Sequence, residues 1–269
     1  MMQLKLFVQK LLPAGVLKTA KSVYRETRGS IKSIAYKGNK VYCPCCNKYF
    51  SSFADFRYSK AFSNSNRFRD TYKNIDCPYC YSHPRHRIVC SFLDTIKEKL
   101  KEDDSAVLMI GAEYAIEKWF RQNKIKYVTT DLFDKTADIK SDIQDMPFES
   151  NSQSLIICNH VLEHVPNVQI ALKELYRILK NDGLLEISVP TDRSLPRTIE
   201  NTGNLSVKER IETFGQIDHM RIFGNDVKEI FTEAGFSVEI IDGDKLPKNI
   251  IAKAGPANYD DNRVYLCRK

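Results

Sequence analysis

From about residue 91 onward, short apolar runs alternate with segments of helical periodicity, and this alternation restricts the fold more than any other feature. The runs predicted as strands are 106–110, 127–130, 137–143, 155–158, 184–189, 236–241 and 264–267. Apolar residues at helical spacing predict helices over 91–101, 167–180 and 226–234, and another carrying Ile116, Trp119 and Phe120. Such alternation is typical of a parallel, doubly wound sheet. The last two runs lack a helix between them, so we expect a hairpin at one edge.

Polar residues gather where the predicted strands end. Ligands of doubly wound sheets lie beyond the carboxyl ends of the strands. Gly111 follows the first strand and permits a close backbone approach, while Asp131 ends the second and can accept two hydrogen bonds from a ribose. Asp142 and Ile143 lie where an adenine edge would dock. Their shared position predicts a ligand site along this edge.

Two cysteine pairs precede this region. Cys43 and Cys46, like Cys77 and Cys80, are separated by two residues, and a proline follows the first cysteine of each pair. Two such turns complete a tetrahedral four-thiolate zinc site, which has no open coordination position and is therefore expected to be structural. Cys45 is an alternative member of the first turn. The 30 residues between the pairs exceed the usual spacing of a compact ribbon and predict a loop or an extra hairpin.

The charge is unevenly divided between the two halves. Residues 1–90 contain 17 Lys and Arg against 4 Asp and Glu, whereas residues 91–269 contain 24 against 30. The basic part either attracts an anionic partner or is a solvated surface. The cationic segment 82–87 either pairs with the zinc thiolates and nearby carboxylates or holds an anion.

We therefore divide the chain into a basic amphipathic segment (1–35), a zinc-ribbon-like module (36–90) and an α/β domain (91–269). The first segment reads as one or two short helices interrupted at residues 13–15, which either pack on the protein or make peripheral membrane contact. No apolar run reaches the length of a transmembrane helix, and no signal peptide is evident. We expect a cytoplasmic protein whose cysteines are metal ligands or buried thiols.

Four segments of the α/β region form a recognisable set: 142–148 (DIQDMPF), 157–165 (ICNHVLEHV), 171–180 (ALKELYRILK) and 234–236 (AGF). Together they resemble the class I S-adenosylmethionine (SAM)-dependent methyltransferases. They occur in the order and spacing of that family over about residues 104–242. Residues 214–221 (FGQIDHMR) are similar to a segment of a bacterial subgroup that also has the paired cysteines. The resemblance implies a Rossmann-like, seven-stranded methyltransferase sheet behind a small N-terminal zinc-binding module.

The resemblance also implies a cofactor site. Its expected residues are Gly111, Ala112, Glu113, Asp131, Leu132, Asp142, Ile143, Asn159 and His160. One departure is that the usual glycine-rich loop is reduced to Gly111-Ala112-Glu113, and Met109 replaces the acidic residue expected in the first strand. In this variant, Glu113 is placed to bind the ammonium group of SAM.

The candidate catalytic residues are His219, Arg221 and His160. By analogy with the family, His160 follows the fourth strand and faces the cofactor. His219 and Arg221 lie in the irregular segment 190–223, where such enzymes build the acceptor pocket. His219 is either a general base or a substrate anchor and Arg221 holds an anionic group, or both residues only fix a loop.

Three hypotheses about the function remain open. A methyltransferase with a small-molecule or glycan acceptor is favoured, because segment 190–223 is typical of a chain that forms a pocket rather than a flat basic surface. An RNA methyltransferase would use the basic module to contact phosphates. A non-catalytic zinc-dependent interaction protein would retain only the fold.

Overall fold

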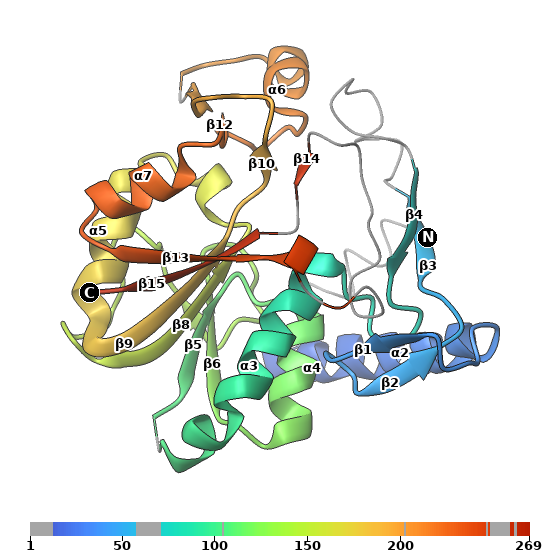
Figure 1. Cartoon of the computed structure of the whole chain (residues 1–269). Coiled ribbons are helices and arrows are strands. Elements are labelled where there is room, and N and C mark those ends of the chain that lie inside the picture. The colour runs from blue at the N-terminus through green and yellow to red at the C-terminus, as the bar shows by residue number, and fades with distance from the viewer. Residues whose placement is uncertain are drawn as a thin grey trace.

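The computed structural model describes residues 13–57, 71–103, 105–201, 203–245, 247, 259–260 and 263–269. Its centre is a seven-stranded sheet in the order β13-β15-β9-β8-β5-β6-β7 (Figure 1). The strands are β5 (Val107–Ile110), β6 (Tyr127–Asp131), β7 (Ile139–Lys140), β8 (Gln153–Asn159), β9 (Leu179–Ser188), β13 (Ser237–Asp242) and β15 (Arg263–Arg268). The first five are parallel, and β15 runs antiparallel to both β9 and β13. The seven-stranded Rossmann-like sheet and its edge hairpin are confirmed.

Helices cover both faces of this sheet. On one side lie α3 (Pro84–Glu102) and α4 (Tyr114–Asn123), and on the other α5 (Val168–Ile178) and α7 (Val227–Glu233) (Figure 1). Alternation along the strands supplies both cores: Met109 and Ile157 join the α3–α4 cluster, whereas Leu108 and Ile156 join the α5–α7 cluster. Strands buried on both faces read as continuous apolar runs, which explains why the sequence revealed them.

Two helix boundaries differ from prediction. Helix α3 begins seven residues earlier than expected and crosses residue 90, where we had placed a domain boundary. Pro84 occupies its first turn, and His83 and His86 cap each other reciprocally, so the helix begins in the cationic segment. Helix α5 ends at Ile178, because the chain enters β9 at Leu179 to pair with Gln153.

The first cysteine pair lies in a small hairpin and the second in the turn that follows another. Strands β1 (Val41–Cys43) and β2 (Lys48–Phe50) form the first hairpin, and β3 (Ala54–Arg57) pairs antiparallel with β4 (Thr71–Asp76), which ends directly before Cys77. Within the 30-residue insertion, β3 and β4 thus pair as an extra hairpin, and the connection between them lies outside the described residues. All four cysteines belong to the same buried cluster as α3, α4 and Trp119. The cysteine module and the sheet therefore share one core.

A single 21-residue helix, α2 (Ala14–Ile34), follows Pro13. Any helix before residue 13 lies outside the described residues. Ion pairs join α2 to three parts of the protein: Lys18 to Asp138, Lys32 to Asp76, and Glu26 to Lys118. The outer face exposes Val23, Ile31 and Ile34, and peripheral membrane contact remains a prediction. Among the described helices, none combines the length and apolarity needed to span a bilayer.

Helix α2 approaches the second cysteine turn most closely at Gly29. A Cβ atom added there would lie 2.0 Å from the carbonyl oxygen of Tyr79. We expect Gly29→Ala to lower the free energy of unfolding by about 1–3 kcal/mol, because α2 would have to move away from the backbone of Tyr79. Urea denaturation measures the loss. Gly15→Ala is the matched control: its Cβ would meet no atom within 4 Å, so it should be neutral or slightly stabilising. Equal effects of the two substitutions would contradict this packing.

The segment after β9 folds into a small cap at the carboxyl edge of the sheet. It contains β10 (Thr191–Asp192), β11 (Ile199–Glu200), α6 (Val207–Phe214) and β12 (Arg221–Ile222). Strand β11 pairs with β12, and β10 pairs with β14 (Tyr259–Asp260). In Figure 1 the cap lies above the ends of β8 and β9. The described part of segment 190–223 thus lies at the carboxyl edge of the sheet, and its role as an acceptor pocket remains a prediction.

Candidate functional site

The structure brings Cys43, Cys46, Cys77 and Cys80 together, with their sulfurs within 4.8 Å of one another and all four side chains buried. The Cys43–Cys80 and Cys46–Cys77 sulfur distances are 3.6 and 3.8 Å. Four sulfurs at about 2.3 Å from a tetrahedral zinc ion lie roughly 3.8 Å apart, so these two distances fit a zinc site. Cys45 is buried but is not a member of this group.

The two cysteine turns have the same backbone form. Each ends in a left-handed residue directly after its second cysteine, Asn47 with φ 52° and Tyr81 with φ 59°. The Ser82 hydroxyl lies 3.1 Å from the Cys43 sulfur, where it can donate to a thiolate. This hydrogen bond and the matched turns orient the ligands as a structural site requires.

The cationic segment 82–87 pairs inside the protein. Arg87 is fully buried, donates to the carbonyl oxygens of Ile75 and Ser82, and lies 3.9 Å from the Phe53 ring centroid. Arg85 and His86 reach forward to Glu113, at 2.6 and 2.7 Å from Oε1. Of the two roles considered for this segment, pairing within the protein or holding an anion, Arg85 and His86 show the first, because both pair with the carboxylate of Glu113.

The turn after β5 has no room for a side chain. Gly111 has φ +64°, and a Cβ there would lie 2.8 Å from a methyl group of Val161. Its amide donates to the Thr130 carbonyl of β6 at 2.9 Å. Glycine therefore permits the turn after β5 to pack against Val161, which follows β8, and its approach to a ligand remains a prediction.

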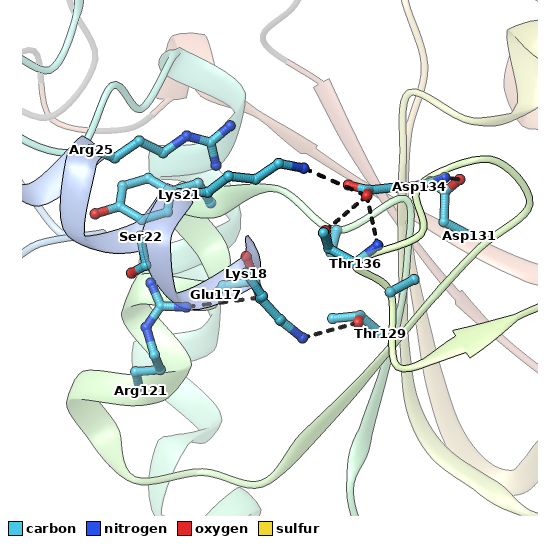
Figure 2. A pocket seen from close by; sticks show the side chains of 13 residues that line it. Lys18, Lys21, Ser22, Arg25, Glu117, Arg121, Thr129, Asp131, Asp134 and Thr136 are labelled. Carbon is cyan, nitrogen blue, oxygen red and sulfur yellow. Dashed lines mark hydrogen bonds and ion pairs between the residues drawn. The ribbon is translucent and has the colours of Figure 1, made fainter. Parts of the chain in front are cut away.

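Asp131 lies at the end of β6, beside a pocket that also includes Ala112. One of its oxygens accepts hydrogen bonds from the amides of Phe133 and Asp134, both at 2.7 Å, which fixes the carboxylate. The opposite wall is formed by Lys18, Lys21, Ser22 and Arg25 of α2 (Figure 2). Helix α2 thus covers this part of the edge, and Lys21 reaches Asp134 at 3.6 Å.

Three further predicted cofactor residues lie on nearby loops. Leu132 is 38% exposed beside Asp131. Asp142 accepts a hydrogen bond from the Gln144 amide at 2.9 Å, which closes the turn after β7, and Ile143 in that turn is buried. The contact of these three residues with a cofactor, and of Asp142 and Ile143 with an adenine edge, remains a prediction.

Glu113 precedes α4 and is paired with Arg85 and His86 through Oε1, whereas Oε2 is buried without a hydrogen-bond partner in the described part of the chain. Burial alone would raise its pKa, but the adjacent charges of Arg85, His86 and His160 hold the pKa of Glu113 well below its usual range. The side chain is therefore an anion that has one oxygen left for a further donor.

A second buried carboxylate, Glu186, lies near Glu113, and sequence reasoning missed it. It lies near the carboxyl end of β9, fully buried, and Asn159 donates to its Oε2 at 3.1 Å. Its Oε1 has no hydrogen-bond partner among the described residues. Burial and the negative charge of Glu113 raise the pKa of Glu186 to about 8. The signal in the sequence was a lone acidic residue inside an apolar run.

The raised pKa of Glu186 predicts pH-dependent stability. An acid whose pKa is higher in the folded state than in the unfolded state loses stability as pH rises between the two values, here from about 4.5 to about 8. We expect Glu186→Gln to increase the free energy of unfolding at pH 8.5 by an amount on the order of a few kcal/mol, and to have little such effect at pH 4.5. Urea denaturation of both proteins at the two pH values measures this, and a difference independent of pH would contradict the assignment.

Asn159 and His160 lie where β8 ends. Asn159 bridges strands by donating to Glu186 and accepting from the Ser188 hydroxyl. His160 has a left-handed φ of 52°, and its amide donates to the Ser188 carbonyl at 2.9 Å. Its Nδ1 lies 3.2 Å from Oε1 of Glu163. The strained turn holds both side chains at the carboxyl edge, where we predicted them.

His219 meets the turn after β8 from the cap. It is 3% exposed, and its ring packs edge-to-face on that of His164 with centroids 4.8 Å apart. Burial lowers the pKa of His219 to about 4, so the imidazole is neutral at pH 7. A neutral ring offers a lone pair to a hydrogen-bond donor or a metal ion, but a pKa this low makes it a weak general base.

Arg221 is 0% exposed and lies beneath the same turn. It donates to the carbonyl oxygens of Leu162 and Pro166 and to Oε2 of Glu200. The guanidinium group is thus already hydrogen-bonded, mainly to the backbone around η1 (Leu162–His164). Of our two alternatives for Arg221, the contacts favour fixing a loop over holding an anionic substrate.

Comparison with known proteins agrees with this architecture. The profile of the family described as "Methyltransferase domain" matches residues 81–240. The ubiquinone/menaquinone biosynthesis C-methyltransferase of Rhizobium rhizogenes is 26% identical over 148 residues, which cover 50% of this chain and 52% of that protein. An uncharacterized protein of Methanocaldococcus jannaschii is 44% identical over 61 residues, 23% of this chain and 27% of that protein. The chain thus spans about half the length of the first relative and about a quarter of the second.

Solved structures with a similar fold include a SAM-dependent methyltransferase from Archaeoglobus fulgidus, which is 17% identical with a TM-score of 0.46 over 68% of this chain and 94% of that one. The trans-methyltransferase CalH, solved with SAH, is 19% identical with a TM-score of 0.42 over 66% and 54%. The family profile covers more than half of the chain, and the sheet has the predicted seven-stranded arrangement. The protein therefore belongs to the methyltransferase domain family and has a class I fold.

Proposed function

We propose that this protein transfers a methyl group from SAM to a small-molecule or glycan acceptor. The observation that carries the proposal is the row of polar groups along the carboxyl edge of the sheet, from Asp131 at the end of β6 through Glu113 to Asn159 at the end of β8. In a doubly wound sheet this edge is where ligands bind.

The anionic Glu113 matches the charge of the cofactor's ammonium group, and the neutral carboxyl group of Glu186 beside it offers a second acceptor oxygen. Oε2 of Glu113 and Oε1 of Glu186 both lack a hydrogen-bond partner within the described residues, and an ammonium group offers three donors. Glu113 and Glu186 would thus hold the amino-acid end of SAM. Asp131 would accept from the ribose hydroxyls, with Leu132 and Ile143 against the adenine.

The bound cofactor supplies an activated methyl group on a good leaving group. The protein then has to hold the acceptor in line and exclude water, and such positioning alone is worth roughly 7–11 kcal/mol in favourable models. We assign His160 and His219 to the acceptor side of the edge. Arg221 is a positioning residue, because it holds the backbone between them.

The choice between acceptor classes rests on the partners of the basic residues. Lys18, Lys21 and Lys32 of α2 each pair with an aspartate of the same chain. Arg85 and Arg87 are likewise occupied internally. Because these five cations already have partners within the molecule, we favour a small molecule or glycan enclosed by the cap over a nucleic-acid backbone.

Transfer of radiolabelled methyl groups tests this function. The zinc-loaded full chain is incubated with methyl-labelled SAM and separate small-molecule, polysaccharide and total-RNA fractions. We expect label in one of the first two, absent with Asp131→Ala and retained with Asp182→Ala, an exposed residue at the opposite edge of the sheet. Label found only in ribonuclease-sensitive material would contradict the acceptor class, and full activity of Asp131→Ala would contradict the cofactor site.

A further inference from the structure

A second group of potential metal ligands lies apart from the four cysteines. Glu163 and His164 belong to η1, directly after the end of β8, and His219 precedes β12 in the cap. One ligand atom from each lies within 4.8 Å of the other two. Ligand atoms around a first-row divalent ion are about 3–3.5 Å apart. Small side-chain rotations would therefore close this set around an ion.

The carboxylate of this group is buried and incompletely satisfied. Glu163 is 1% exposed, and its Oε2 has no hydrogen-bond partner among the described residues. Its other oxygen lies 3.2 Å from Nδ1 of His160 and 3.9 Å from Nε2 of His164. A buried carboxylate oxygen without a donor is costly, and a cation removes that cost.

His164 is oriented as metal-binding histidines are. Its Nδ1 lies 3.2 Å from the carbonyl oxygen of Asp218 and 3.4 Å from its carboxylate, while Nε2 faces Glu163. A hydrogen bond from Nδ1–H to Asp218 fixes the tautomer that leaves the Nε2 lone pair for an ion. The His164 side chain is 34% exposed, so the group is accessible from solvent on that side.

We propose that Glu163, His164 and His219 form a divalent-cation site at the carboxyl edge, and that the ion binds an oxygen atom of the methyl acceptor. Two imidazoles and one carboxylate suit manganese, iron or zinc ions. Three protein ligands leave coordination positions for water or substrate, unlike the closed four-cysteine site. The position after β8, beside Asn159 and His160, places the ion next to the expected site of methyl transfer.

The role of the ion rests on the proposed function. A cation bound to an acceptor hydroxyl lowers its pKa, so the proton passes to water. The resulting oxyanion forms the new oxygen–carbon bond as the carbon–sulfur bond breaks, and that bonding pair remains on sulfur. This narrows the acceptors to molecules in which the oxygen that receives the methyl group, or an oxygen next to it, can bind a metal ion.

Manganese titration followed by electron paramagnetic resonance tests the site, because Mn²⁺ prefers oxygen and nitrogen ligands to thiolates. The full chain, with one zinc per molecule confirmed by mass spectrometry, should bind one Mn²⁺. Glu163→Gln and, independently, the partly exposed His164→Gln should each weaken binding about 10- to 100-fold or more. Glu212→Gln, which removes an exposed carboxylate of α6, is the control and should change nothing.

Absence of stoichiometric manganese binding in the wild type would overturn the site, as would unchanged affinity in both variants. Calorimetric titration of the same samples with SAM separates this result from the proposed function. SAM binding without manganese binding would reject the metal site and leave the methyltransferase proposal standing. Manganese binding without SAM binding would support the site and reject its role in methyl transfer.

Discussion

Cys46→Ser is expected to lower the stability of the whole chain, not only of the N-terminal module. The sulfur lies 3.8 Å from that of Cys77 and is buried in the cluster that includes α3, α4 and Trp119. Structural zinc contributes on the order of 10 kcal/mol to the folding of small zinc modules. Losing one ligand should therefore remove about 5 kcal/mol or more, comparable to the total stability of many domains.

Zinc content and thermal unfolding measure this effect. We expect less than one zinc per chain and a large decrease in Tm for Cys46→Ser. Cys45→Ala is the matched control, since Cys45 is equally buried but stands outside the ligand group. It should keep one zinc per chain. Full zinc content and an unchanged Tm in Cys46→Ser, or equal zinc loss in both variants, would contradict the four-cysteine assignment.

Arg221→Met is expected to produce the second large effect, about 3–5 kcal/mol of lost stability. The substitution leaves the buried carbonyls of Leu162 and Pro166 without their donor and leaves Glu200 without its partner. Lys208→Met, on the exposed face of α6, should change the free energy of unfolding by less than about 0.5 kcal/mol. Urea denaturation compares the two.

The same variant separates the two roles considered for Arg221. If Arg221 fixes the turn after β8, its substitution should lower the free energy of unfolding and, by displacing Glu163 and His160, weaken function at the site. If Arg221 only binds an anionic acceptor, the substitution should leave the urea midpoint unchanged while raising KM. An unchanged midpoint would therefore contradict the positioning role.

The sequence predicted the sheet well because its strands are buried on both faces and read as apolar runs. It placed the start of α3 too late, although His83-Pro84 and His86 together cap that helix. It also left α6 unassigned, although Ser206 and Glu209 form a capping box visible in the sequence. The start of α3 and the whole of α6 were missed because their starting signals are polar, whereas our periodicity criterion followed apolar residues.

The candidate site was predicted in position but not in its connections. The four cysteines and the edge residues lie where spacing and strand order indicated. The pairing of Glu113 with Arg85 and His86 joins the residue before α4 to the first turn of α3, and no local pattern reports such a contact. Glu186 was overlooked for a related reason: one acidic residue in a strand acquires meaning only from its buried neighbours, Glu113 and Asn159.

The central claim is that the carboxyl edge binds SAM, and calorimetric titration of the folded, zinc-loaded chain with SAM and SAH tests it most directly. We predict binding at micromolar concentration with one site per chain, lost in Asp131→Ala and retained in Asp182→Ala. No binding by wild-type protein with intact fold and full zinc content would contradict the claim, as would equal binding by Asp131→Ala.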